Sequence, residues 1–91
     1  MAPLNAKEAD RQIRAKCRSI GLNLNKPENA YIIADIDIQG SWDIHHASTL
    51  ADAEHLARNR PFNPEIPIYI MPADEQHRIM VLKDGKLVPA Q

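Results

Sequence analysis

The sequence predicts a small α+β domain with an N-terminal helix followed by elements in the order β-β-α-β-β-β. Three observations lead to this prediction. Apolar residues recur at helical spacing before Gly21, they alternate with polar residues over 31–46, and short apolar strands flank an Asp84-Gly85 turn. We expect one domain over 1–91, with a basic helix and linker in 1–29 and an antiparallel sheet with a second helix in 30–91. The sheet would pack against both helices.

The first helix is predicted over residues 6–20. Asn5 stands where an N-cap is needed, and Glu8 occupies the capping-box position, from which its side chain would reach back to the Asn5 backbone. Gly21 would end the helix because glycine adopts the left-handed conformation at low cost. The predicted apolar face consists of Ala6, Ala9, Ile13, Cys17 and Ile20.

A β-hairpin is predicted from two strands, 31–38 and 42–46, joined by the three-residue turn 39–41. This loop length keeps apolar and polar residues on separate faces, whereas a two-residue loop would mix them. The predicted pairs are Ile38 with Trp42, Ile36 with Ile44 and Ala34 with His46 on one face, and Asp37 with Asp43 and Asp35 with His45 on the other.

The second helix is predicted over residues 50–59, after the capping pair Ser48 and Thr49. Its expected buried stripe is Leu50, Ala53, Leu56 and Ala57.

Three further strands are predicted over 66–71, 77–82 and 86–88, with the loop 61–65 before the first of them. Pro67 indicates an edge strand or the start of a strand. A two-residue turn at Asp84-Gly85 pairs Leu82 with Leu87 and Val81 with Val88, which makes both faces of the hairpin apolar. We expect the N-terminal helix to cover the second apolar face, with a partner or a second copy as the alternative.

Composition bounds the function classes. A chain of 91 residues with 4% aromatic residues builds a small aliphatic core, which leaves little volume for a deep substrate cavity. The single cysteine, Cys17, excludes an internal disulfide and fits a reducing compartment. The first residues contain no apolar signal segment, and no apolar run is long enough to span a membrane, so we expect a cytoplasmic protein without a membrane partner.

Charge is divided unevenly along the chain. Residues 1–29 hold six basic and three acidic residues, and residues 30–91 hold five basic and nine acidic ones, which sums to the net charge of −1. The basic residues of the first helix follow i, i+4, i+7, i+11 spacing and form a narrow stripe away from its apolar face. Such a stripe fits an acidic protein surface or a phosphate backbone, and equally an ordinary solvated face. The stripe consists of Lys7, Arg11, Arg14 and Arg18.

The predicted hairpin collects a second charged cluster on its exposed face. Carboxylates and an imidazole can ligate a metal ion, but an open sheet lacks the surrounding support of metal sites. We expect a solvated polar face or a patch for a basic partner, with no bound metal and no cofactor. The cluster consists of Asp35, Asp37, Asp43 and His45.

Residues 30–88 resemble a small class of phage-encoded anti-CRISPR proteins. The resemblance is carried by Ala30-Tyr31-Ile32-Ile33, by the capped helix that begins at Ala47-Ser48-Thr49-Leu50 and runs through Ala57, and by the hairpin with Asp84-Gly85-Lys86. It implies a compact α/β inhibitor that binds a type I surveillance complex and blocks access to target DNA. Glu54 and His55 stand where that class carries a basic pair, and the basic N-terminal helix has no counterpart, so no functional residue is carried over.

Three hypotheses follow for function. The first is a non-enzymatic protein-binding module, an inhibitor from a mobile element that binds a CRISPR-type surveillance complex or another host complex through the basic stripe, the acidic cluster or both. The second is a nucleic-acid-binding regulatory protein that uses the basic helix. The third is a metal-dependent enzyme at the acidic cluster. The pattern leaves both a monomer and a homodimer open.

Overall fold

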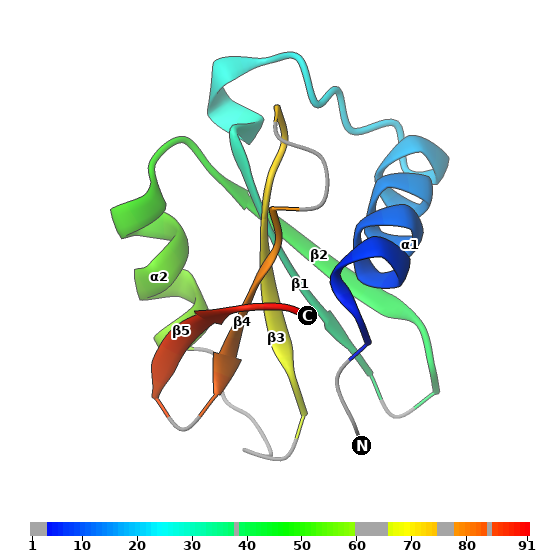
Figure 1. Cartoon of the computed structure of the whole chain (residues 1–91). Helices are drawn as coiled ribbons and strands as arrows, with labels where there is room; N and C mark the ends of the chain where they lie inside the picture. The colour runs from blue at the N-terminus through cyan, green and yellow to red at the C-terminus, as the bar shows by residue number, and fades with distance from the viewer. Residues whose placement is uncertain (1–3, 38, 60–65, 75–77, 84) are drawn as a thin grey trace.

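Helix α1 (Ala6–Ser19) and helix α2 (Leu50–Arg58) lie on opposite faces of a five-stranded antiparallel sheet, as Figure 1 shows. The structure, a computed structural model, describes residues 4–37, 39–59, 66–74, 78–83 and 85–91. The predicted α+β class and the predicted order of elements are confirmed. The strands are β1 (Tyr31–Ile36), β2 (Trp42–Ala47), β3 (Ile68–Pro72), β4 (Met80–Lys83) and β5 (Lys86–Pro89), in the sheet order β2-β1-β3-β4-β5.

Helix α1 begins and ends through local interactions. The Asn5 side chain accepts a hydrogen bond from the Glu8 backbone N–H at 2.8 Å, which confirms the predicted N-cap. The Glu8 side chain does not complete the capping box in the predicted way, since it accepts from Arg11 and Gln12. At the other end Gly21 has φ 75°, and the Leu22 N–H bonds to the Cys17 carbonyl.

Helix α2 is capped by Thr49, whose hydroxyl accepts from the Asp52 N–H at 3.1 Å. Ala53 and Ala57 are buried against the sheet, and Leu50 packs at the margin of that cluster. The prediction that Leu56 belongs to the buried stripe is wrong, because its exposed fraction is 37%. The buried strip of α2 is narrow and is built from alanine, so the helix can approach the sheet closely.

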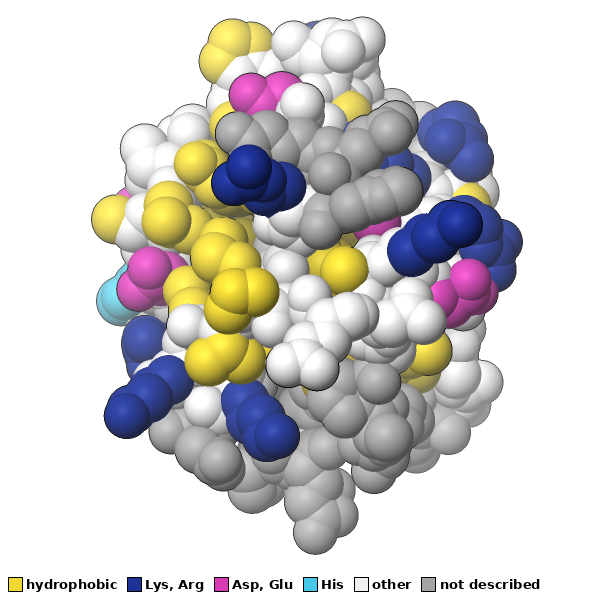
Figure 2. All heavy atoms as spheres, viewed as in Figure 1, with side chains coloured by type: hydrophobic (Ala, Val, Ile, Leu, Met, Phe, Trp, Pro, Cys, Tyr) yellow, Lys and Arg dark blue, Asp and Glu magenta, His cyan; other side chains and the backbone are white. Residues whose placement is uncertain are grey.

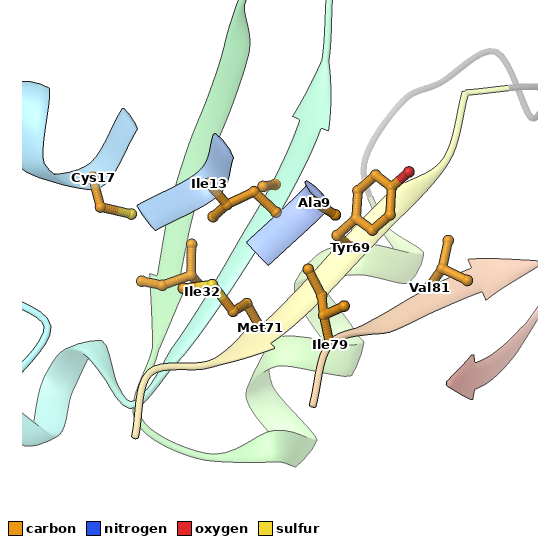
Figure 3. Close-up of a cluster of buried hydrophobic side chains, with 9 residues drawn as sticks. Ala9, Ile13, Cys17, Ile32, Tyr69, Met71, Ile79 and Val81 are labelled. Carbon is orange, nitrogen blue, oxygen red and sulfur yellow. The ribbon is translucent and has the colours of Figure 1, made fainter. Parts of the chain in front are cut away.

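The sheet separates the core into two apolar clusters. Even-numbered residues of β1 face α1, where Ile32 and Ala34 pack with Tyr69 and the buried stripe of the helix, while odd-numbered Ile33 faces α2. Figure 3 shows the α1 side, with side chains from α1, β1, β3 and β4 converging between helix and sheet. Cover of both faces by the chain's own helices is therefore confirmed for the sheet as a whole. The buried cluster under α1 consists of Ala9, Ile13, Cys17, Ile32, Ala34, Tyr69, Met71, Ile79 and Val81.

The first hairpin differs from the prediction by two residues in register. Ala34 pairs with Ile44 rather than with His46, and Asp35 pairs with Asp43 rather than with His45. Five residues, 37–41, join the strands in place of the predicted three. A shift of two residues keeps every side chain on its predicted face because side chains alternate with a period of two. The predicted pair of Ile38 with Trp42 involves Ile38, which lies outside the described residues.

The C-terminal hairpin has the predicted register. Leu82 pairs with Leu87 and Val81 with Val88, and Gly85 has φ 79°, as a primed two-residue turn requires. Pro67 lies immediately before β3, so it marks a strand start, and β3 is a central strand. The predicted loop 61–65, the predicted strand start at His77 and the turn residue Asp84 lie outside the described residues.

Candidate partner-binding surfaces

The acidic cluster is only partly assembled by the fold. Asp35, Asp43 and His45 do share one sheet face, and the Asp43 and His45 side chains are 54% and 45% exposed. Asp35 is different: it is 4% exposed, because its face is the one that α2 covers. The expectation that these residues lie together on an open sheet face is therefore wrong for Asp35.

Asp37 has a structural position in the first hairpin. Its Oδ1 accepts from the backbone N–H groups of Gln39 at 2.8 Å and Ser41 at 2.9 Å. A side chain that satisfies two turn amides is an Asx-type turn former. Asp37 therefore holds the turn, where the predicted register had placed it in the strand opposite Asp43.

The described residues of the acidic cluster are not gathered into a metal-binding group. Among those residues no group of three or more His, Cys, Asp or Glu side chains could hold a metal ion. The hypothesis of a metal-dependent enzyme at Asp35, Asp37, Asp43 and His45 thus lacks a ligand set there, since Asp35 is buried and Asp37 is engaged in the turn.

Arg14, in the middle of the basic stripe, points toward the protein. Its Nε donates to Asp10 Oδ1 at 2.8 Å, and its two Nη atoms donate to the carbonyls of Ala73 at 2.9 Å and Pro72 at 3.2 Å. The Arg14 and Asp10 side chains are 14% and 5% exposed. This guanidinium therefore ties α1 to the end of β3, and it is not presented to a partner.

Three cations of the predicted stripe remain on the outer side of α1. Lys7, Arg11 and Arg18 are exposed, and they fall within about 40° of one another around the helix axis. From the first to the last, the rise along the helix is about 16 Å. Figure 2 shows basic side chains gathered on the flank that carries α1. We call Lys7, Arg11 and Arg18 the α1 basic face.

Glu8 lies beside this face and forms an ion pair with one of its cations, Arg11. Its carboxylate accepts hydrogen bonds from Arg11 and, at 2.9 Å, from Gln12 Nε2. The bond from Arg11, reinforced by the bond from Gln12, lowers the pKa of Glu8 from 4.5 to about 2. Exposed pairs of this kind contribute little to stability, so Arg11 stays available for a stronger acceptor.

The titration of Glu8 provides a direct test of this contact. Since the folded-state pKa lies below the unfolded value, the contribution of the pair is present above pH 4.5 and is lost as the pH falls from 4.5 to about 2. We expect an NMR titration of the Glu8 carboxyl to give a midpoint near 2. Arg11→Gln should move that midpoint toward 4.5, whereas Arg18→Gln should leave it unchanged. A wild-type midpoint at 4.5 would contradict the contact.

Cys17 is a core residue. It is fully buried on the side of α1 that faces the sheet, and burial raises the pKa of its thiol, against the smaller opposing effect of Arg14 and Arg18. A buried thiol with a raised pKa is a poor nucleophile. The expectation from its place on the apolar stripe agrees with this position.

A further polar group, which the sequence pattern did not indicate, lies at the start of α2. His46, on β2, has Nδ1 3.2 Å from the Glu28 carbonyl oxygen. The 3-10 turn η1 (Pro27–Asn29) thereby packs against the C-terminal end of β2. The shallow depression between them is lined by Glu28, His46, Ala47, Ser48, Asp52, His55 and Leu56. Only the fold could reveal this group, because its members come from separate elements.

No helix in the described part of the chain is long and apolar enough to cross a membrane. Among the residues that the sequence predicted to contact a partner, Lys7, Arg11 and Arg18 of the α1 basic face and Asp43 and His45 on β2 have exposed side chains. No protein-family model matches the chain, and neither does any curated protein or solved structure.

Proposed function

We propose that this chain is a non-enzymatic protein-binding module that contacts an acidic surface of its partner through the α1 basic face. The strongest supporting observation is that the arginines of α1 differ in what they contact. The fold uses Arg14 for its own stability and leaves Lys7, Arg11 and Arg18 exposed on one side. Arginine forms planar, bidentate contacts with carboxylates, which suits it to protein interfaces.

A protein partner fits the surface better than a nucleic acid. Single-stranded nucleic acids are bound with exposed aromatic side chains, and the described aromatic residues are buried or partly buried. Trp42, for example, packs edge-on against Tyr69 and donates from its indole nitrogen to Gln12. The net charge of −1 would also oppose binding to a duplex, which rewards a strongly basic surface.

The resemblance to anti-CRISPR proteins gives this proposal a first partner to test. It implies an inhibitor from a mobile element that binds a type I surveillance complex. The α1 basic face has no counterpart in that class, so the contact proposed here would be specific to this chain. Another host complex with an acidic surface is the alternative within the same proposal.

Charge reversal on α1 tests the proposal. The full chain is immobilised and exposed to a purified type I surveillance complex and to host lysate, and retained proteins are identified by mass spectrometry. We expect Arg11→Glu with Arg18→Glu to weaken the retained partner's binding by about tenfold or more, because two interfacial attractions become repulsions. The matched control is Lys83→Glu with Lys86→Glu, which changes the net charge equally on other elements, β4 and β5.

Two results would count against the proposal. If both double variants retain the partner as well as the wild type does, the α1 basic face is not the contact. If the wild type binds no protein but binds DNA or RNA with an affinity that falls steeply as salt rises, the chain is a nucleic-acid-binding protein. Before binding is compared, far-UV circular dichroism of each variant is used to check that its helices are intact.

A further inference from the structure

The two edges of the sheet differ in their protection against strand addition. At one edge, β5 has four residues and includes Lys86 and Pro89, a charged residue and a residue without an N–H. At the other edge, β2 has six residues and contains neither lysine nor proline. Proteins usually block edge strands with such residues, so β2, which is longer and has Asp43 as its one acidic residue, is the less protected edge. No described strand pairs with its outer side.

The hydrogen bonds of the first hairpin establish which residues of β2 have backbone N–H and C=O groups that face away from β1. Asp37 N–H donates to the Ser41 carbonyl at 2.8 Å in the same register as the strand pairs. Hydrogen-bonded pairs therefore involve odd-numbered residues, because the two kinds of antiparallel pair alternate. The N–H and C=O groups of the even-numbered residues face away from β1. These residues are Trp42, Ile44 and His46.

From this arrangement we infer that two copies of the chain pair through their β2 strands, antiparallel and about a two-fold axis at Ile44. The two five-stranded sheets would then form one continuous sheet. A two-fold pairing must be self-complementary, since each strand presents the same residues to the other. The side chains of β2 meet this requirement in one register.

Side-chain chemistry favours that register over its two neighbours. Even-numbered residues must pair with even-numbered residues across the new contact, and the neighbouring pairings that satisfy this are centred on Asp43, Ile44 and His45. The first places Asp43 opposite Asp43, and the third places His45 opposite His45. The pairing centred on Ile44 places Asp43 of each copy opposite His45 of the other. An imidazole N–H can donate to the facing carboxylate, whereas two facing carboxylates repel each other.

The same register also matches the two faces of the sheet. On the side of α1, Ile44 meets Ile44, and Trp42 meets His46 of the second copy. On the side of α2, the two Asp43–His45 pairs lie where both side chains are about half exposed. Within one chain the same two side chains lie 3.8 Å apart, from His45 Nε2 to Asp43 Oδ2. The pairing therefore places an Ile44–Ile44 contact on the α1 side and the polar Asp43–His45 pairs on the α2 side.

A charge-swap series tests the pairing by sedimentation velocity. We expect the wild-type chain to form a species of twice the 10.3-kDa chain mass. His45→Asp would oppose two pairs of carboxylates and should weaken the dimer by about tenfold or more. Combining it with Asp43→His restores both pairs in exchanged positions, with the same composition as the wild type, and should restore the dimer. A monomeric wild type at the highest soluble concentration, or a double variant as weak as His45→Asp, would overturn the inference.

Disulfide trapping tests the register itself. Asp43 and His45 of the two copies would form a non-hydrogen-bonded pair with Cα atoms about 4.5 Å apart, within the range that a disulfide spans. A mixture of Asp43→Cys and His45→Cys chains keeps one native pair and should oxidise mainly to the mixed dimer. Equal trapping within either variant alone would contradict the register. Wild-type chain, with only buried Cys17, is the control for thiol background.

This inference is independent of the partner proposed for α1. The α1 basic face and the β2 edge share no residue. Loss of dimer with intact partner binding, or the reverse, would therefore separate the two surfaces experimentally.

Discussion

Replacing Arg14 by alanine is expected to lower the free energy of unfolding by about 3 kcal/mol. The guanidinium is 14% exposed, pairs with the nearly buried Asp10 and donates to the carbonyls of Pro72 and Ala73. The substitution leaves a buried carboxylate without its cation and removes two hydrogen bonds that join α1 to β3. Urea denaturation followed by circular dichroism measures the change.

Two further variants make this result specific. Arg14→Lys keeps the charge near Asp10 but loses the planar fork that reaches two carbonyls, so an intermediate loss is expected. Arg18→Ala removes an arginine of the same stripe from an exposed position and should change the free energy of unfolding by less than about 0.5 kcal/mol. Equal losses for Arg14→Ala and Arg18→Ala would show that Arg14 does not clamp α1 to the sheet.

The behaviour of Arg14 explains what helical spacing can and cannot predict. Spacing correctly places Lys7, Arg11, Arg14 and Arg18 on one side of α1, because a helix fixes the direction of each Cα–Cβ bond. Spacing does not determine which acceptor groups a long side chain reaches. The two carbonyl acceptors of Arg14 lie 58 and 59 residues away in the sequence, so only the packing of α1 on the sheet reveals them.

The first hairpin shows a similar limit. Alternation determines faces, and the faces of Asp35, Asp43 and His45 were predicted correctly. Two registers that differ by two residues have the same faces, so alternation could not distinguish them. The turn decides between them, because Asp37 leaves the strand to accept two backbone amides. The C-terminal hairpin has the predicted register, since an Asp-Gly turn permits few geometries.

Exposure of the acidic cluster was harder to predict than its face. An alternating strand has one apolar and one polar face, and the polar face was expected to meet solvent. Here β1 is a central strand with helices on both sides, and Asp35 is buried with Ile33 on the α2 side. The position of a strand within the sheet depends on β3, whose partner could not be deduced from local pattern.

The second large effect is expected at Ile13, for which the chain contains its own matched control. Ile13 and Ile20 were both placed on the apolar face of the first helix, yet Ile13 is fully buried and Ile20 is 52% exposed. Ile13→Ala should lower the free energy of unfolding by about 3 to 4 kcal/mol, because it leaves a cavity between α1 and the sheet. Ile20→Ala removes the same atoms and should cost less than about 1 kcal/mol.

The comparison of these two variants decides how α1 is attached. The helix could be a separate basic arm on a complete sheet domain, in which case both substitutions would be mild and unfolding of α1 would precede that of the sheet. The buried contacts of Ile13 with the α1-side cluster argue instead that helix and sheet unfold together. Coincident circular dichroism and Trp42 fluorescence transitions in Ile13→Ala would support the integral helix. Trp42 is a suitable reporter because it lies against this cluster and bonds to Gln12 of α1.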